Sequence, residues 1–432
     1  MSRRITRALT ALLVCVTLGP IGCETTPDTE PLPFTDLLEP DDDTRAAATL
    51  FRTILIEPAG SDAGPGWSYA AAADEVLTLI DGAEFLLEVM LEDFEDAQVA
   101  EAIAAADARG VDVRVVGDVD RRDQRGFRLL EEAGLAPVYG DGEILWNGVF
   151  GEDPILRTGA DNRMTHNVII ADRQRLISLS AGFPDNVREI GQAGFAADSE
   201  VLARDFGNIF DQLYGGVFAT TLTYYDQPVV SDSNNRTLYE TEESVIELYF
   251  GPQEPLVKEL IDRIYAARSA VWIATSSMLN SEIARALRYK GAAGFDVRLV
   301  ISGQGTAQDE AGDLPETFAE IAELRGDALP ALRVLPALAG SGTLIILDGQ
   351  PLFPGDPKQP GVAMVLSAAL LESVPYAITN VRPDGLDLEA RPSDRFTDAH
   401  LWAVHGGPDD HTDYRVLREQ FLRIFEAAEE VE

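Results

Sequence analysis

The stretch VAEAIAAADARGVDVRVV at 99–116 recurs as IARALRYKGAAGFDVRLV at 283–300. Both stretches belong to longer segments, 76–117 and 260–301, that align without gaps at an offset of 184. Each segment predicts a helix, an apolar strand, a second helix that stops at a glycine, and a second strand. Alternating helices and strands predict an open α/β sheet covered by helices, and the repeat predicts two such halves.

Each half then continues to an apolar strand that ends in aspartate, VIIAD at 168–172 and LIILD at 344–348. Two similar halves usually build one site at their junction, so these strands are expected to supply it. The residues beside the strands nevertheless carry few of the ionisable side chains on which catalysis depends. This conflict governs every functional interpretation of the sequence.

The chain is predicted to contain five segments: a signal peptide at 1–22, an acidic, proline-rich tether at 23–45, a first half at 46–223, a linker at 224–243 and a second half at 244–432. At 432 residues it is long enough for two domains. Its composition, 46% hydrophobic and 25% charged, is that of a globular protein with ample material for a core in each half.

The N-terminus has the pattern of a secretory signal, because three arginines precede a short apolar run at 8–21. A membrane-spanning helix would need about 20 apolar residues. The segment LGPIGC at 18–23 resembles a bacterial lipoprotein signal, although Pro20 stands where that signal usually has leucine. The resemblance implies an exported protein held on a membrane by lipid on Cys23, facing the periplasm or the cell exterior. The alternative is an ordinary secretory signal with a chance cysteine.

The net charge is strongly negative, at −39 for the whole chain. Cleavage before Cys23 would remove three arginines and no acidic residue, leaving −42 and only three lysines. Such a field repels phosphate backbones and anionic lipid headgroups, so nucleic-acid binding is not expected. Solubility or a salty habitat explains most of this charge without a partner.

The repeat resembles the phospholipase D superfamily over nearly the whole mature chain, most directly through RGVDVRV at 109–115. Members of that family carry two copies of H-x-K-x4-D, each followed by a Gly-Ser strand. The resemblance implies two pseudo-symmetric halves, each a mixed sheet flanked by helices. It also implies a mechanism in which one histidine attacks phosphorus, the other protonates the leaving group, and lysines hold the phosphate.

In the first half, alignment on Asp172 places Thr165 at the family's histidine position and Asn167 at its lysine position. Ser180 is retained, but Leu179 replaces the glycine before it. The resemblance therefore implies a degenerate site that has lost both its nucleophile and its cation.

In the second half, alignment on Asp348 places Ser341 at the histidine position and Thr343 at the lysine position. Ser367 is retained behind Leu366. No catalytic residue of the family is intact in either half, and no cofactor or metal is predicted. Neither retained serine has a His-Asp arrangement near it in the sequence, so serine-hydrolase chemistry is not predicted.

The four histidines offer weaker alternatives. His166 follows the degenerate position by one residue, so strand alternation should point it away from Thr165, as a packed or surface side chain. A β-bulge could re-aim it toward catalysis. His400, His405 and His411 are expected in exposed loops; if 400–405 is a strand, the first two face opposite sides. A metal site with Asp398, Asp409 and Asp410 is a minor alternative.

Two further features concern charge and shape. Arg163, Arg173 and Arg175 flank the first degenerate motif, where a solvated edge is favoured over a phosphate site. A phosphate-sized pocket lined by the four degenerate positions would favour ligand binding. A junction filled by large apolar side chains would favour a protein without a ligand cleft.

The sequence thus predicts a catalytically inactive phospholipase D-like protein of the cell envelope that acts as a binding or scaffolding module. A divergent phosphodiesterase or phospholipase that uses other residues is the first alternative. An envelope assembly component without a ligand cleft is the second. The expected partners are a membrane, reached through the lipid anchor, and a phosphate-containing ligand; protein partners are left open.

Overall fold

The computed structural model describes residues 50–56, 69–140, 144–146, 155–157, 163–184, 192–216, 218, 238–240, 245–251, 256–275, 281–302, 331–335, 342–348, 361–367, 397–406 and 412–430. The signal peptide, the tether with Cys23, Ser341, Asp409, Asp410 and His411 lie outside these residues, as do most positions of the linker.

The first half is built on a seven-stranded mixed sheet. Its strands, in spatial order, are β1 (Leu50–Ile56), β10 (Gln192–Asp198), β9 (Arg175–Leu179), β8 (Val168–Ala171), β2 (Leu86–Leu91), β3 (Asp112–Gly117) and β4 (Val138–Tyr139). The pairs β2–β3 and β3–β4 are parallel and the other four are antiparallel. The helices of this half are α1 (Tyr69–Asp81), α2 (Ala97–Ala108), the short 3₁₀ helix η3 (Val119–Arg121), α3 (Arg125–Glu132) and α4 (Glu200–Tyr214).

The second half repeats this architecture. Its sheet runs β11 (Leu238–Glu240), β12 (Val245–Gly251), β18 (Thr397–His405), β17 (Val362–Leu366), β16 (Thr343–Leu347), β13 (Ala270–Thr275), β14 (Asp296–Ser302), β15 (Ala331–Leu335) and β19 (Glu429–Glu430). Its helices are α5 (Leu256–Ala266), α6 (Ser281–Ala292) and α8 (Thr412–Ala427). A separate hairpin joins β5 (Ile144–Trp146) to β6 (Ile155–Arg157), and β7 (Arg163–Met164) pairs with β18.

The two sheets share one strand order, since β12-β18-β17-β16-β13-β14-β15 repeats β1-β10-β9-β8-β2-β3-β4. The duplicated segments supply β2 and β3 in one half and β13 and β14 in the other, joined by α2 and α6. The predicted fold of two similar mixed-sheet halves is therefore confirmed. Strand β11 arises within the predicted linker and extends the second sheet by pairing with β12.

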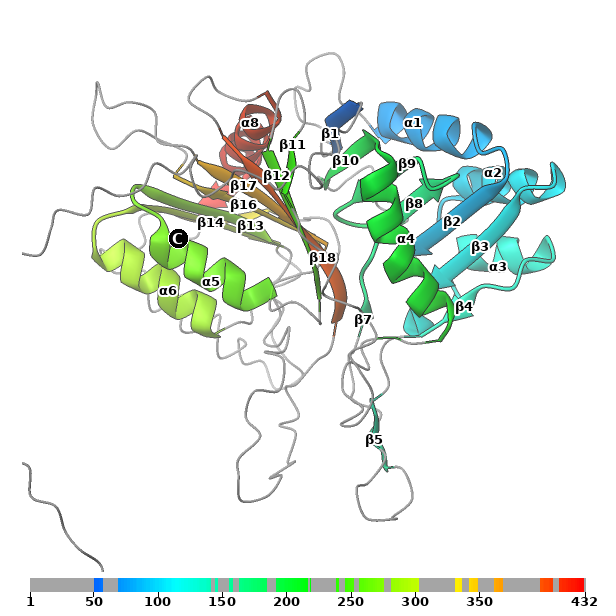
Figure 1. Cartoon of the computed structure of the whole chain (residues 1–432). Helices are drawn as coiled ribbons and strands as arrows, with labels where there is room; N and C mark the ends of the chain where they lie inside the picture. Colours follow the sequence, from blue (N-terminus) through cyan, green and yellow to red (C-terminus); the bar gives the residue numbers. More distant parts are fainter. Residues whose placement is uncertain are drawn as a thin grey trace, which may run out of the picture. The chain divides into compact units, whose positions relative to one another are not determined.

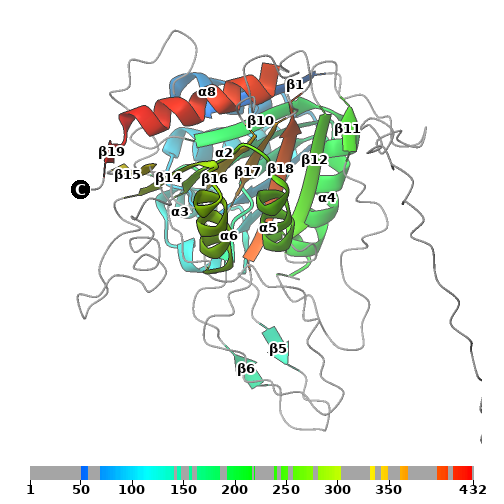
Figure 2. The same ribbon diagram turned by 90° about the vertical axis from the view of Figure 1, so that its left-hand side faces the viewer.

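Three apolar clusters hold the fold together. One lies under α1 and α2 of the first half, and one lies under α5 and α6 of the second. Figure 2 shows α5 and α6 side by side on one face of the second sheet. The third cluster contains residues of both halves, so the inner faces of the two sheets share a core with α4 and α8. Strand β18 and helix α4 lie at this junction (Figure 1).

Helix α8 of the second half also protects the exposed edge of the first sheet. The Asp413 carboxylate accepts hydrogen bonds from the Thr53 backbone N–H at 3.1 Å and the Thr53 hydroxyl at 2.8 Å. An open edge strand otherwise invites pairing with another chain. None of the helices in the described ranges has both the length and the hydropathy that a membrane crossing requires.

Candidate functional site

The two retained aspartates perform the same backbone task in both halves. Asp172 and Asp348 adopt positive φ angles of 56° and 55°. The Asp172 carboxylate accepts the backbone N–H groups of 84–86 at 3.0, 2.9 and 3.0 Å. Asp348 accepts those of 268–270 at 2.6, 2.7 and 3.4 Å. Burial raises the pKa of Asp172, but these N–H groups outweigh burial and leave that pKa lowered.

The two retained serines are likewise equivalent. Ser180 donates its backbone N–H to the Ala193 carbonyl at 2.8 Å, and its hydroxyl accepts the Ala193 N–H at 3.2 Å. Ser367 makes the same pair of bonds with His400, both at 3.0 Å. His400 thus occupies in the second half the place that Ala193 occupies in the first. Asp and Ser at these positions have a local structural role that does not require catalysis.

The degenerate positions are only partly brought together. Thr165 Oγ1 lies 3.4 Å from Ser367 Oγ across the junction. Asn167 stays within its own half, accepting the Glu92 N–H and donating to the Thr165 carbonyl, both at 3.0 Å. Thr343 Oγ1 lies 2.9 Å from the Thr275 hydroxyl of its own half.

Gly342 shows how closely the halves approach beside these positions. A Cβ atom at Gly342 would lie 2.5 Å from Ser180 Cβ, closer than real Cβ contacts allow, so only glycine fits. Thr165, Asn167, Thr343 and Ser367 are each 1% exposed, and none of them is cationic. These four residues themselves would offer a phosphodiester hydroxyl and amide groups but no positive charge.

Two histidines meet at the junction instead. His166 Nδ1 of the first half lies 2.9 Å from His400 Nδ1 of the second. His400 Nε2 lies 2.7 Å from Ser178 Oγ, which also accepts the indole N–H of Trp402 at 3.0 Å. His166 is fully buried, so it is the packed rather than the surface side chain of the two predicted alternatives. It reaches β18 while the adjacent Thr165 reaches the end of β17.

The expectation of exposed loop histidines is wrong for His400 and His405, which lie on strand β18 at 1% and 7% exposure. Tight packing of both sheets buries strand β18, although its histidines had suggested an exposed polar segment. The conditional prediction that 400 and 405 face opposite sides is confirmed, because His400 enters the junction and His405 contacts Glu247. In the described part of the chain, no group of three potential ligands could hold a metal ion.

Serine, histidine and a second histidine in a hydrogen-bonded chain resemble a nucleophile, its general base and an orienting group. Burial opposes that chemistry here, because Ser178, His400 and His166 are at most 1% exposed. The Trp402 N–H also donates a hydrogen bond to the Ser178 oxygen. Burial lowers the pKa of His166 to about 3. The pKa of His400 is lowered by burial first and by the charge of His166 second.

Aromatic rings surround this chain. Trp402 packs on Phe195 with ring centroids 5.0 Å apart and on Phe206 at 5.5 Å. Phe206 also contacts His400 at 5.1 Å and Phe250 at 5.0 Å. These rings belong to β10, α4, β12 and β18, so the two halves fill their junction with large apolar side chains.

The arginines beside the first motif are engaged by protein groups. Arg173 Nη2 binds the fully buried carboxylate of Glu88 and the half-exposed carboxylate of Asp211, both at 2.6 Å. Arg163 lies 3.5 Å from the buried Glu92. Arg175 donates to the Gly82 carbonyl at 2.7 Å. Their charges serve the fold, which supports the structural interpretation over a phosphate site.

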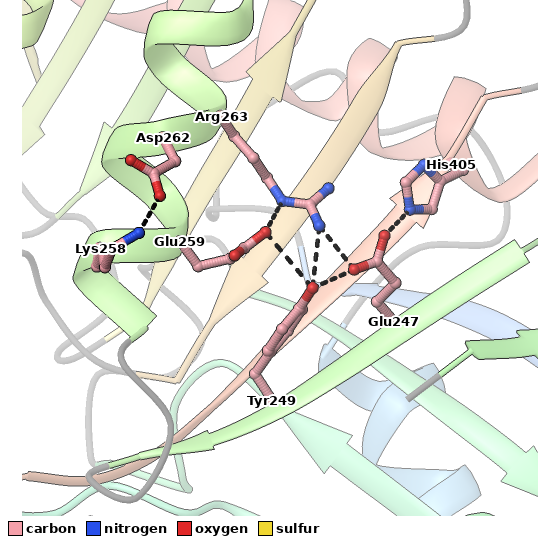
Figure 3. Close-up of polar contacts among 7 residues, drawn as sticks. All are labelled: Glu247, Tyr249, Lys258, Glu259, Asp262, Arg263 and His405. Carbon is pink, nitrogen blue, oxygen red and sulfur yellow. Dashed lines mark hydrogen bonds and ion pairs between the residues drawn. The ribbon is translucent and has the colours of Figure 1, made fainter. Parts of the chain in front are cut away.

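A second polar network lies on the outer face of β12, away from the junction (Figure 3). Arg263 binds Glu247 and Glu259, both at 2.6 Å, while Tyr249 and His405 also contact Glu247. Burial raises the pKa of Glu247, but His405 and Arg263 outweigh burial and lower that pKa to about 2. Glu247 therefore remains ionised, and every described member of this network has a protein partner.

Comparisons with known proteins show a shared fold and little sequence similarity. No family model matches the chain, and no curated protein matches it. Phosphatidylserine synthase from Haemophilus influenzae Rd KW20 is similar with a TM-score of 0.54 and 11% identity, over 89% of this chain and 88% of that chain.

Two further solved structures are similar at lower TM-scores. Nuc from Salmonella typhimurium, a phospholipase D family member, has a TM-score of 0.29 and 19% identity, over 38% of this chain and 94% of that one. Polyphosphate kinase from Porphyromonas gingivalis has a TM-score of 0.47 and 12% identity, over 92% of this chain and 53% of that one. The chain thus spans about half the length of that kinase. At these identities, the synthase likeness shows the fold alone, and the fold predicted from the sequence repeat is confirmed.

Strand β18 contributes to the junction in a way that was not predicted from the sequence. The segment AHLWAVH at 399–405 alternates, with His400, Trp402 and Val404 on one face and Ala399, Leu401 and Ala403 on the other. That alternation predicts a strand buried on both faces. It could have placed His400 beside Trp402, although the partner across the junction could not have been identified this way.

Proposed function

We propose that this chain, which has the phospholipase D-like fold, is an envelope scaffolding module that does not hydrolyse phosphodiesters. The observation that carries the proposal is the state of the junction. The hydroxyl and amide groups at the degenerate positions bond to neighbouring hydroxyls or to backbone, and aromatic rings pack around the nearby His166–His400 pair. Phosphoryl transfer requires a nucleophile, an acid for the leaving oxygen and positive charge for the equatorial oxygens.

The filled junction favours scaffolding over binding of a small phosphate-containing ligand. Trp402, Phe206 and Phe250 belong to the core that the two halves share, so large apolar side chains fill this part of the junction. A scaffolding role needs only a stable shell and an attachment point. Both are part of the proposal, with the attachment point at Cys23.

A divergent phosphodiesterase is the second candidate, because His166 and His400 come from opposite halves and meet at the junction. For hydrolysis, one imidazole would have to attack phosphorus and the other protonate the leaving oxygen. Both imidazoles are buried, and a hydrogen bond joins their Nδ1 atoms. Activity would therefore require the halves to separate, which makes this candidate weaker.

The purified wild-type protein is expected to show no turnover of bis-p-nitrophenyl phosphate or of phospholipid vesicles above the rate without protein. Loss of one transition-state donor costs roughly 10²–10³ in rate, and here the family's nucleophile, acid and cations are all replaced. Turnover that disappears in Thr165→Ala would assign catalysis to the hydroxyl cluster. Turnover that disappears in His166→Asn would support the second candidate. Either result would overturn the inactive proposal.

Lipid anchoring at Cys23 makes a separate prediction. The Cys23→Ser variant is expected to move from the membrane fraction to the soluble fraction after cell lysis. Each buried acyl methylene contributes about 0.8 kcal/mol, so loss of two acyl chains should abolish stable attachment. Cys15→Ser, which changes the apolar run and leaves Cys23 intact, is the matched control. Membrane association that is equal in both variants would contradict the anchor.

A further inference from the structure

The hydrogens of the junction chain can be assigned from its donors and acceptors. Trp402 Nε1 can only donate, so its bond to Ser178 Oγ leaves the serine hydrogen for another acceptor. In the described residues, the acceptor within reach of that hydrogen is His400 Nε2, at 2.7 Å. His400 then carries its own hydrogen on Nδ1 and donates it to His166 Nδ1.

This assignment makes both imidazoles neutral. It leaves the His166 hydrogen on Nε2, a buried atom without a hydrogen-bond partner in the described part of the chain. A proton added at His166 Nδ1 would set two N–H groups against each other across 2.9 Å. A proton added at His400 Nε2 would displace the Ser178 hydrogen from its acceptor. Either proton would place a charge inside the shared core.

The described carboxylates near the pair have other partners. Beside His166, Glu92 lies 3.5 Å from Arg163, and Asp118 accepts the Met164 N–H at 2.8 Å. Helix α4 presents Phe206 to His400, and its neighbour Asp205 accepts the Tyr239 hydroxyl. Asp211 on the same helix binds Arg173. On β12, Phe250 faces His166, whereas Glu247 lies on the opposite face with Arg263 and His405. The remaining neighbours are Ser178, Ser367 and Trp402, which do not titrate as acids or bases near neutral pH.

We propose that the His166–His400 pair is an acid-sensitive latch between the two halves, closed while both imidazoles are neutral and opened when either takes up a proton. The latch joins the first half to strand β18, whose far end binds Glu247 through His405. This inference concerns how the halves are held together, and it stands whether or not the protein hydrolyses any substrate.

The direction of the pH effect follows from linkage. In the open state, each histidine titrates near its ordinary pKa of about 6.5, whereas burial lowers that pKa in the closed state. The stabilisation is therefore fully present above pH ~6.5 and is lost as the pH falls below it. The ratio of open to closed protein should rise up to about 10-fold per pH unit for each histidine, and about 100-fold for the pair.

Other titrating groups do not reproduce this effect. Glu247, whose pKa is lowered to about 2, loses its contribution only as the pH falls below about 4.5. Burial is the chief cause of the raised pKa values of Glu88, Asp118 and Asp205. A fall in pH therefore increases the stability of the folded protein through these groups, whereas it decreases stability through the histidine pair. A loss of protection between pH 6.5 and 5 therefore points to histidine.

Hydrogen exchange of the full-length protein tests the latch through the amide protection factors of β9 and β18, corrected for intrinsic exchange. In the wild type, these factors should fall by up to about 100-fold per pH unit between pH 6 and 5. His166→Asn keeps an acceptor for His400 Nδ1 and removes one titrating ring, so its fall should be only about 10-fold. His405→Gln, on the opposite face of β18, is the matched control and should behave as the wild type.

Wild-type protection that stays constant between pH 7 and 5 would overturn the latch, and so would a His166→Asn slope equal to that of the wild type. If His166→Asn does not fold, the histidine ring resonances of the wild type provide a second test. With only four histidines in the chain, two resonances should remain at their neutral positions at pH 5.5 while the protein stays folded. Four histidines titrating near pH 6.5 would likewise overturn the proposal.

Discussion

Replacing Arg173 with methionine is expected to lower the free energy of unfolding by about 3–5 kcal/mol at pH 7. Arg173 is the partner of Glu88, whose side chain is fully buried on β2. The pair shows how closely the opposing energies balance. Burial keeps the pKa of Glu88 raised despite the ion pair, while the bond to Glu88 raises the pKa of Arg173. Desolvation of the buried Glu88 carboxylate is the larger energy, so loss of Arg173 would leave a costly unpaired charge.

Loss of Arg173 should also make stability depend on pH. An unpaired Glu88 would be protonated in the folded protein, with its pKa raised further above 4.5. The deficit of Arg173→Met should therefore shrink as the pH falls from 7 toward 4.5, and should grow as the pH rises. Urea unfolding at several pH values measures this trend.

A double variant separates the cost of unpaired charge from the value of the pair. Replacing Glu88 with leucine and Arg173 with methionine together should restore most of the lost stability, because an apolar pair often matches a buried ion pair. Arg52→Met, which breaks the exposed pair with Glu75 at 2.9 Å, is the control and should cost at most about 1 kcal/mol. A loss in Arg173→Met no larger than in this control would refute the argument.

The second large effect is expected at the junction. Replacing Trp402 with alanine should lower the free energy of unfolding by about 3–5 kcal/mol, because it removes a ring packed on Phe195, Phe206 and Phe51. Since Trp402 belongs to the second half and these three rings to the first, both halves should be affected. Calorimetry should show one unfolding transition in both the wild type and the variant, at a lower temperature in the variant.

Two controls identify the origin of that effect. Trp402→Phe keeps most of the ring contact and loses only the N–H bond to Ser178, so its cost should be about 0.5–1.5 kcal/mol, the net worth of one hydrogen bond. Tyr289→Ala removes a ring that is 61% exposed, and should change stability by no more than about 0.5 kcal/mol. Two separate transitions in Trp402→Ala, one of them unchanged from the wild type, would mean that the halves do not share a core.

Much of the fold followed from local pattern. The ungapped repeat located β2, α2 and β3 in one half and β13, α6 and β14 in the other, because helix and strand periodicity are properties of neighbouring residues. The strand that ends in aspartate was also readable in both copies. Asp172 and Asp348 then proved equivalent in backbone angle and in hydrogen bonding, which gives a physical reason for aspartate at both positions.

The candidate site was harder to predict from the sequence. The degenerate positions were located from the repeat. Among the described ones, Thr165 meets Ser367 across the junction, and Ser180 lies against Gly342 of the other half. Asn167 and Thr343 bond within their own halves, and Ser341 lies outside the described residues. Small polar side chains can form hydrogen bonds either within their own half or across the junction. The sequence does not specify which of these partners lies within bonding distance.

The sequence by itself determined the two halves, the alternation of helices and strands within each repeat and the absence of the family's histidine and lysine at the aligned positions. Only the tertiary structure decided what fills the junction. His166 and His400 are 234 residues apart, yet their Nδ1 atoms lie 2.9 Å from each other. Their meeting depends on the register of β17 with β18 and on the packing of one half against the other. Such contacts depend on shape and burial between residues that are far apart in the sequence. Local periodicity specifies only which side chains lie on each of the two faces of a strand.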